Sequence, residues 1–209
     1  MYLSKLTLNA RHPRTRSEFD KPYELHRTLC KAWEDPQAAR VLFRLDQDQP
    51  GCVSVVVQSQ TEPNWLGLDA PGEYLRSIEG PKQMKLAALT SGRSLHFRLR
   101  ARPSKRIGAR ESDGKGKRRT LTAKDEIFEW LDRKAEMGGF QICEAAFDRV
   151  YWHESKGGAE EKTLGGVVFE GTLVVNDADK LREAVRNGIG PQKAYGFGLL
   201  SLAPVGGAP

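Results

Sequence analysis

The order of strand-like and helix-like patterns after Gly92 limits the fold of this chain more than any other sequence feature. Apolar and basic side chains alternate over residues 95–101, whereas residues 127–135 carry apolar side chains at helical spacing. The predicted elements are a strand at 95–101, a helix between Thr122 and Gly138, strands within 140–152 and at 167–175, a helix at 177–187 and a strand at 197–202. This order is that of a complete ferredoxin-like βαββαβ unit.

The first part of the chain begins in the same order. The predicted elements are a strand at 2–9, a helix at 20–33, and strands at 41–45 and 53–57 joined by a turn at Gln49-Pro-Gly51. The Pro- and Gly-containing residues 62–92 carry at most a short helix near 73–78. We therefore predict an α+β fold of two tandem ferredoxin-like, RRM-related domains, residues 1–88 and 93–209.

Cysteine usage and hydropathy exclude several classes of protein. The three cysteines, Cys30, Cys52 and Cys143, are far apart and form no CxxC pair, so the sequence contains no zinc-binding framework. Such sparse usage suits the reducing cytoplasm. The sequence has no apolar run of about 18 residues, so no transmembrane helix is predicted. The N-terminus lacks the pattern of a signal peptide. We expect a cytoplasmic protein with no cofactor and no bound metal.

Basic residues are concentrated in one part of the chain, which has a net charge of +6. Residues 93–119 hold eleven of the 33 Lys and Arg, opposed only by Glu111 and Asp113. They occupy alternate positions of the strand at 95–101 and then a Gly-containing loop at 103–119. A scattered charge run is usually a solvated loop, but this one is rich in Arg, which favours bidentate phosphate contacts. The pattern therefore predicts contact with nucleic acid.

A second candidate site is the glycine-rich stretch from Gly188 to Gly198. Gly188 is expected to cap the preceding helix, but Gly190, Gly196 and Gly198 are more than a cap requires. Glycine lets the backbone approach a phosphate closely, and Lys193 adds a positive charge. The Walker pattern is absent, so this is not an NTP-binding loop.

The predicted helix at 20–33 carries Tyr23 and His26 three residues apart, and therefore side by side on its surface. A phenol and an imidazole in this position can transfer protons near neutral pH, and Arg27 can bind a phosphate. Most such pairs are structural, so the spacing alone does not establish catalysis. The other histidines, His12, His96 and His153, are predicted to be non-catalytic.

These motifs together resemble a known family. The matching segments are the N-terminal strand, Pro22-Tyr-Glu-Leu-His-Arg-Thr-Leu29, Arg98-Leu-Arg-Ala-Arg-Pro-Ser-Lys105 and Gly188-Ile-Gly-Pro-Gln-Lys-Ala-Tyr-Gly-Phe-Gly-Leu-Leu-Ser-Leu202. From Met1 to Pro204 the chain is similar to the CasE/Cse3 family, the endoribonuclease subunit of the type I-E CRISPR complex Cascade. The resemblance implies cleavage of a repeat RNA hairpin at its 3′ base, without a metal, by attack of a ribose 2′-OH that leaves a 2′,3′-cyclic phosphate and a 5′-OH. It also implies that the product is retained.

The resemblance makes Tyr23 and His26 the expected catalytic pair, with the choice between general acid and general base left open for His26. The expected RNA-binding residues are Arg27, Arg98, Arg100, Arg102, Lys105, Arg106, Arg110, Lys115, Lys117, Arg118, Arg119, Gly190, Lys193, Gly196 and Gly198. The expected partners are the CRISPR repeat hairpin and other Cascade subunits, with a monomer in isolation and no membrane. The alternatives are a non-catalytic RNA-hairpin-binding module and a structural protein that holds an assembly together.

Overall fold

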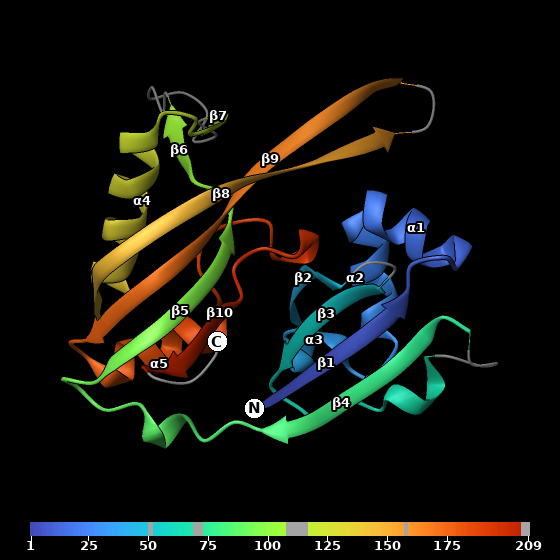
Figure 1. Ribbon diagram of the computed structural model, residues 1–209, viewed down its shortest axis with the longest axis horizontal. Helices are drawn as coiled ribbons and strands as arrows, with labels where there is room; N and C mark the ends of the chain where they lie inside the picture. Colours follow the sequence, from blue (N-terminus) through green and yellow to red (C-terminus); the bar gives the residue numbers. More distant parts are fainter. Residues whose placement is uncertain (50–51, 69–72, 108–116, 157–158, 206–209) are drawn as a thin grey trace.

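The computed structural model has two four-stranded antiparallel sheets, one from each half of the chain (Figure 1). The structure describes residues 1–49, 52–68, 73–107, 117–156 and 159–205. The side chains of residues 47–49, 117 and 152–164 lie outside that description. The last strand of the first sheet ends at Gln83, and the first strand of the second sheet begins at Ser94.

The first sheet has the strand order of a ferredoxin-like unit, β2-β3-β1-β4. Its strands are β1 (Tyr2–Asn9), β2 (Leu42–Gln49), β3 (Cys52–Ser59) and β4 (Leu75–Gln83). Its helices are α1 (Pro13–Asp20), α2 (Pro22–Cys30), α3 (Pro36–Ala39) and the 3₁₀ turn η1 (Trp65–Gly67). The short η1 stands where a complete unit has its second long helix.

Two predictions for this half are wrong. No helix is predicted between the strand at 2–9 and the helix at 20–33, but α1 forms there. Its Pro13 occupies the first helical turn, and Nδ1 of His12 accepts a hydrogen bond from the Arg14 N–H. The buried residues of α1 are Thr15 and Glu18, so no apolar periodicity reveals the helix. Residues 73–78 do not form a helix, and residues 75–78 are instead the first part of β4, an almost entirely exposed strand with no apolar alternation.

The second sheet forms the complete unit predicted from the sequence, with strand order β10-β5-β9-β8. Its elements are β5 (Ser94–Ala101), α4 (Lys124–Met137), β8 (Phe140–Lys156), β9 (Ala159–Val175), α5 (Ala178–Asn187) and β10 (Leu200–Pro204). Inserted segments are β6 (Ser104–Ile107), β7 (Lys117–Thr120) and the 3₁₀ turn η3 (Lys193–Tyr195), while η2 (Leu86–Ala88) lies between the sheets in sequence.

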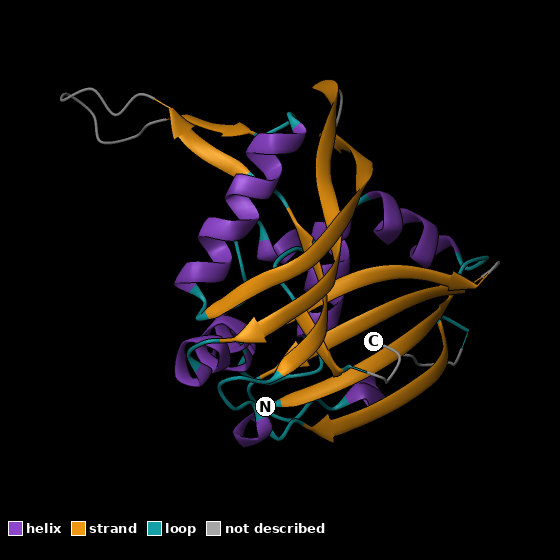
Figure 2. Ribbon diagram, turned by 60° about the vertical axis from the view of Figure 1, so that its left-hand side comes forward, coloured by secondary structure: helices purple, strands orange, loops and turns teal. Residues whose placement is uncertain are grey.

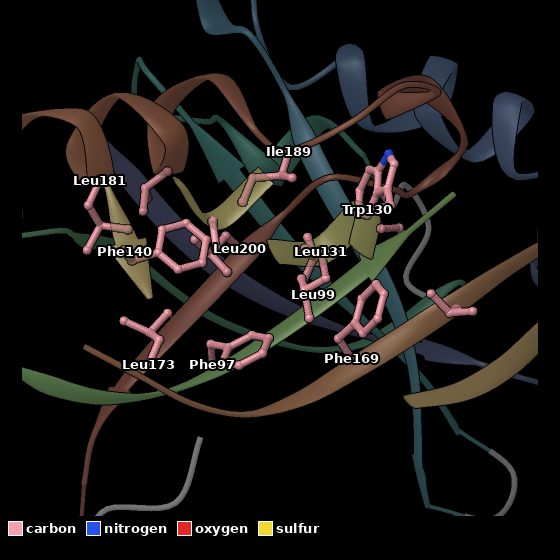
Figure 3. Packing of buried hydrophobic residues seen from close by; sticks show 14 of the residues in the cluster. Phe97, Leu99, Trp130, Leu131, Phe140, Phe169, Leu173, Leu181, Ile189 and Leu200 are labelled. Carbon is pink, nitrogen blue, oxygen red and sulfur yellow. The ribbon is translucent and has the colours of Figure 1, made fainter. Parts of the chain in front are cut away.

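A separate hydrophobic core supports each sheet. In the second, the predicted helical stripe of α4 is buried against the sheet, and the ring of Trp130 stacks on that of Phe169 at a centroid distance of 6.3 Å (Figure 3). In the first, Leu25 and Leu29 of α2 are buried, as their spacing predicts. Each half therefore has the apolar interior of a folding unit.

The strands predicted within 140–152 and at 167–175 are longer than expected, because most of the polar residues 154–166 between them also belong to β8 and β9. Strand pairing continues from Phe140↔Val175 to Lys156↔Ala159, and the hairpin extends beyond the rest of the sheet (Figure 1). The backbone N–H and C=O groups of paired strands bond to each other whatever side chains the strands carry, so a strand can form without apolar alternation. The prediction failed because it relied on that alternation.

Buried polar contacts join the two halves. Nε of Arg44 donates to both carboxylate oxygens of Asp46 at 3.0 Å, and Nη1 of Arg44 donates to Oγ of Ser201 in β10 at 2.6 Å. The side chains of Arg44 and Asp46 are only 6% and 5% exposed. Gln58 of β3 donates from Nε2 to the carbonyl of Val185 in α5 at 2.7 Å. The first sheet is thus bonded to both a strand and a helix of the second half.

The predicted basic face of residues 95–101 is present but partly covered, because Arg98 and Arg100 lie at this junction. Arg100 is buried, and its Nη1 donates to the carbonyl of Leu45 at 3.4 Å. Burial lowers the pKa of Arg100 to about 10. Arg98 lies 3.6 Å from Asp46 and 2.8 Å from Glu170. Arg100 therefore bonds the two halves together, and the guanidinium group of Arg98 is paired with two carboxylates.

Replacing Asp46 is expected to weaken the fold strongly. Asp46→Ala would leave the Arg44 guanidinium buried without its carboxylate, which typically costs about 3–5 kcal/mol in the free energy of unfolding. Urea unfolding followed by circular dichroism measures this change. The control Glu170→Ala removes a carboxylate that is 58% exposed, so about 0–1 kcal/mol is expected. Equal losses in the two variants would contradict the importance of the buried pair.

Candidate active site and nucleic-acid interface

Helix α2 places Tyr23 and His26 at the seam between the two halves. Its apolar side faces the first sheet, which leaves Tyr23 46% exposed and His26 half-buried. The rings of Tyr23 and His26 are 6.3 Å apart at an interplanar angle of 19°, and the His26 ring lies 6.0 Å from that of Phe43 in β2. The two predicted catalytic side chains are therefore neighbours, with the imidazole held between a phenol and a buried phenyl ring.

Burial favours the neutral form of His26. It lowers the pKa of the imidazole from its usual value, and it raises the pKa of the Cys30 thiol, one helical turn further along α2. Sγ of Cys30 lies 3.8 Å from both ring nitrogens. A neutral imidazole has one donor and one acceptor nitrogen, so His26 can accept a proton from a hydroxyl group at neutral pH.

The glycine-rich stretch folds back against this helix, so that η3 contacts both α2 and β2. Gly190, Gly196 and Gly198 all have positive φ, between 79° and 90°. A Cβ on Gly196 would lie 3.1 Å from the Phe43 ring, and the N–H of Gly198 donates to the carbonyl of Arg100 at 2.8 Å. Conformation and close packing thus account for these glycines; their contact with RNA remains a prediction.

Two basic side chains stabilise this loop. Nζ of Lys193 donates to the carbonyl of Gly190 at 3.1 Å, and burial, followed by the nearby charges of Arg40 and Lys134, lowers the pKa of Lys193. Arg102 donates from Nη1 to Oε1 of Gln192 at 2.8 Å. Its Nε donates to Oγ1 of Thr120, the last residue of β7. Arg102 therefore connects the glycine-rich loop to the basic segment.

The basic segment is a β-hairpin, not the predicted loop, and it projects from the body of the molecule beside α4 (Figure 2). The cross-strand pairs are Ser104↔Thr120, Lys105↔Arg119, Arg106↔Arg118 and Ile107↔Lys117. Of the expected RNA-binding residues, Arg110 and Lys115 lie outside the described residues, as does the side chain of Lys117. The sequence prediction missed the strands because charged side chains conceal their alternation.

The two faces of this hairpin differ in charge compensation. Lys105 and Arg119 both contact Glu126 of α4, at 2.6 Å and 2.8 Å, and chiefly the Lys105 hydrogen bond lowers the pKa of Glu126. Arg106 and Arg118 are exposed directly opposite one another, and no carboxylate pairs with either within the part of the chain that the structure describes. Like charges in opposed positions destabilise a hairpin, and a polyanion relieves the repulsion.

The remaining basic residue of the prediction, Arg27, lies on the exposed side of α2. Its Nη1 contacts Oε2 of Glu24 at 3.1 Å, and both side chains are solvated. A pair of this kind holds its partners weakly, so Arg27 is available to a phosphate near His26. Its role stays a prediction.

The described residues contain no group of three or more potential metal-ligating His, Cys, Asp or Glu side chains. Within the same residues, no helix has the length and hydropathy needed to cross a membrane.

Tyr195 also lies at this site, although it is not among the residues predicted from the sequence. Its ring centroid lies 5.7 Å from that of Tyr23, although the two residues come from different halves of the chain. The signal was present, because Tyr195 lies within the glycine-rich stretch. Only the fold, however, brings that stretch to α2.

Comparison with known proteins gives the family. A family model described as "CRISPR associated protein" matches residues 1–204. The CRISPR-associated endoribonuclease Cse3 of Thermus thermophilus is 38% identical, covering 98% of this chain and 100% of the relative. This chain belongs to the Cse3/CasE family. The Cascade subunit CasE of Escherichia coli K12, another member, is 32% identical over 98% of this chain and 100% of its own length.

Solved structures of Cse3/CasE family members share the fold. A structure of Cse3 bound to a 19-nucleotide RNA has a TM-score of 0.85 at 36% identity and covers 98% of this chain and 100% of that one. A Thermus thermophilus Cse3 structure with an RNA representing a pre-cleavage complex has a TM-score of 0.82 at 36% identity, with coverages of 97% and 98%. Cas6e of Escherichia coli K12 has a TM-score of 0.71 at 30% identity, with coverages of 98% and 100%. The predicted tandem ferredoxin-like fold is confirmed.

The pKa of His26 has a measurable consequence. Because burial lowers it, the unfolded chain binds more protons than the folded chain just below the usual pKa of 6.5. The stability contributed by neutral His26 is therefore present above pH 6.5 and decreases as the pH falls through the folded-state pKa. We expect an NMR titration of the His26 ring to have a midpoint below that of the same histidine in the urea-unfolded chain. A midpoint at or above the unfolded value would contradict the effect of burial.

Proposed function

We propose that this chain is a metal-independent endoribonuclease that cleaves the repeat hairpin of CRISPR precursor RNA at its 3′ base. It then retains the product as a subunit of Cascade in the cytoplasm. The proposal is supported chiefly by the Tyr23–His26 pair, which lies at the seam beside the glycine-rich loop in a chain 38% identical to a protein named as an endoribonuclease. Free of its partners, the protein is a monomer.

The proposed reaction is an internal transesterification. The ribose 2′-OH loses its proton, and its oxygen forms a bond to the adjacent phosphorus. The bond from phosphorus to the 5′ oxygen breaks, and that oxygen takes up a proton, which leaves a 2′,3′-cyclic phosphate and a 5′-OH. His26 serves one of the two proton transfers, and Tyr23 orients or activates the 2′-OH. One group must take up the 2′-OH proton and one must supply a proton to the 5′ oxygen; the proposal gives His26 one of these roles and assigns no step to a metal.

The binding surface proposed for the RNA stem is the basic hairpin together with the glycine-rich loop. Duplex RNA has a deep and narrow major groove, so proteins hold a stem largely through phosphates and 2′-OH groups. The exposed Arg106–Arg118 pair offers two guanidinium groups on one face, suited to bidentate phosphate contacts. Arg102 joins this hairpin to the glycine-rich loop, which in turn contacts the helix that carries Tyr23 and His26.

The two halves then have separate tasks. We assign residues 1–88 to an N-terminal domain that carries the catalytic helix, and residues 93–209 to a C-terminal domain that binds the RNA stem. The separate cores support this division. The buried contacts between the sheets fix the position of the catalytic helix relative to the RNA-binding surface.

His26→Ala is expected to reduce cleavage of a repeat hairpin by at least about 100-fold, since it removes a general acid or base. The measurement is a single-turnover assay in excess EDTA with an end-labelled hairpin. Replacing the scissile 2′-OH by 2′-H should abolish cutting by the unaltered protein, because the nucleophile is absent.

Hairpin binding in a gel-shift assay is expected to survive the His26→Ala change, and it serves as the control for folding. Cutting at the normal rate by His26→Ala would refute the role of His26. Tight binding of the repeat without cutting by the unaltered protein would favour the non-catalytic binding module.

Charge removal from the hairpin is expected to change the salt dependence of binding. Arg106→Ala with Arg118→Ala removes two phosphate contacts, so the slope of log K against log salt concentration should decrease in magnitude by about 1.4–1.8. Fluorescence anisotropy at several salt concentrations measures the slope. The matched control, Arg76→Ala with Lys82→Ala on β4, removes two exposed cations outside the proposed surface and should leave the slope unchanged. Equal slopes for all proteins would exclude the Arg106–Arg118 face from the interface.

A further inference from the structure

Tyr195 brings an aromatic ring from the second half of the chain to the candidate active site. It is the last residue of η3, and its ring lies 5.7 Å from that of Tyr23 at an interplanar angle of 34°. Tyr23 in turn lies 6.3 Å from His26, and His26 lies 6.0 Å from Phe43. Four rings thus form a continuous row from η3 across α2 to β2.

We propose that Tyr195 is a positioning residue, which holds the Tyr23 ring against His26. The second half of the chain thereby supplies a residue to a reaction centre whose catalytic pair lies in the first half. The inference rests on the proposed function, because it assigns Tyr23 and His26 to the reaction. It adds a residue from outside the catalytic helix and a reason why the two halves must be joined.

Tyr23 needs such support because its own helix gives it little. It lies in the first turn of α2, where Lys21 provides no side-chain cap, and nearly half of its side chain is exposed. An exposed tyrosine samples several rotamers, and only some of them keep the phenol beside the imidazole. A ring packed against its open side restricts those rotamers through aromatic contact.

Tyr195 is itself well fixed. The flanking residues Gln192 and Gly196 both adopt left-handed backbone conformations, with φ of 62° and 79°. The N–H of Tyr195 donates to the carbonyl of Gln192 at 3.0 Å, and the Tyr195 side chain packs on the buried ring of Phe197. The loop therefore presents the ring in a defined direction.

This arrangement also links the reaction centre to the RNA-binding hairpin. Arg102, at the base of the hairpin, donates to the side chain of Gln192, the residue that precedes η3. The path from hairpin to active site is therefore Arg102, Gln192, Tyr195 and Tyr23. A stem held by the hairpin is thereby placed at a set distance from the Tyr23–His26 pair.

Single-turnover cleavage with protein in saturating excess tests the proposal. Tyr195→Ala is expected to slow cleavage about 3- to 10-fold, the effect of one lost aromatic contact, while the dissociation constant of the hairpin stays within twofold. Tyr195→Phe keeps the ring and should cut at the normal rate. The matched control, Tyr151→Ala, removes a tyrosine that is 62% exposed on β8 and should have no effect.

Tyr195→Leu keeps an apolar group over Phe197 and replaces the alanine variant if that protein unfolds. Three results would overturn the proposal: normal cleavage by Tyr195→Ala and Tyr195→Leu, weaker hairpin binding with an unchanged rate at saturation, or equally slow cleavage by Tyr195→Phe. The second would make Tyr195 an RNA contact, and the third would place the function in its hydroxyl group.

The NMR signal of the His26 ring provides a readout that needs no cleavage. Loss of the Tyr195 ring should let Tyr23 leave its stacked position, which would shift the His26 ring protons in Tyr195→Ala but not in Tyr195→Phe. An unshifted signal in Tyr195→Ala would refute the positioning role. Failure of the unaltered protein to cut RNA would refute the proposed function instead, and the NMR result would still decide where Tyr23 is held.

Discussion

The buried ion pair of Arg44 and Asp46 is the interaction on which the joint structure depends. Each half has its own apolar core, and apolar contacts such as that of Met1 with the second core also cross between them. Directional polar contacts add to these, among them the bond from Arg44 to Ser201. Buried charges tolerate little change in geometry, because a displaced partner leaves an unpaired charge out of water. A junction of this kind fixes relative position more strictly than an apolar contact would.

The candidate active site exploits that fixed position. Helix α2 uses Leu25 and Leu29 to pack on the first sheet, and this places Tyr23 and His26 on the side facing η3. The glycines around η3 permit the positive φ angles that turn the loop toward α2. Neither half alone contains the row of rings that ends at Phe43.

The sequence predicted the elements whose side chains repeat regularly. Helix α4 is readable because Trp130 and Leu131 belong to an apolar stripe, and β5 because Phe97 and Leu99 alternate with polar residues. Helix α1 was missed since polar groups dominate it. The pair Tyr23 and His26 could be found from spacing and family resemblance. The burial of Arg100 could not be predicted from the sequence. Alternation along a strand shows that a residue points away from the apolar face, but it does not show whether water or another sheet covers that residue.

Glu126 makes the two faces of the basic hairpin chemically different. Its single carboxylate satisfies Lys105 and Arg119 on one face, in the place where a nucleic acid would offer a phosphate. A polyanion approaching that face must displace an intramolecular ligand, whereas one approaching Arg106 and Arg118 meets charges with no such competitor among the described residues. Among the described residues, the hairpin thus has an intramolecular carboxylate on the Lys105–Arg119 face and none on the Arg106–Arg118 face. If the hairpin binds RNA as we propose, this difference favours approach from the Arg106–Arg118 face.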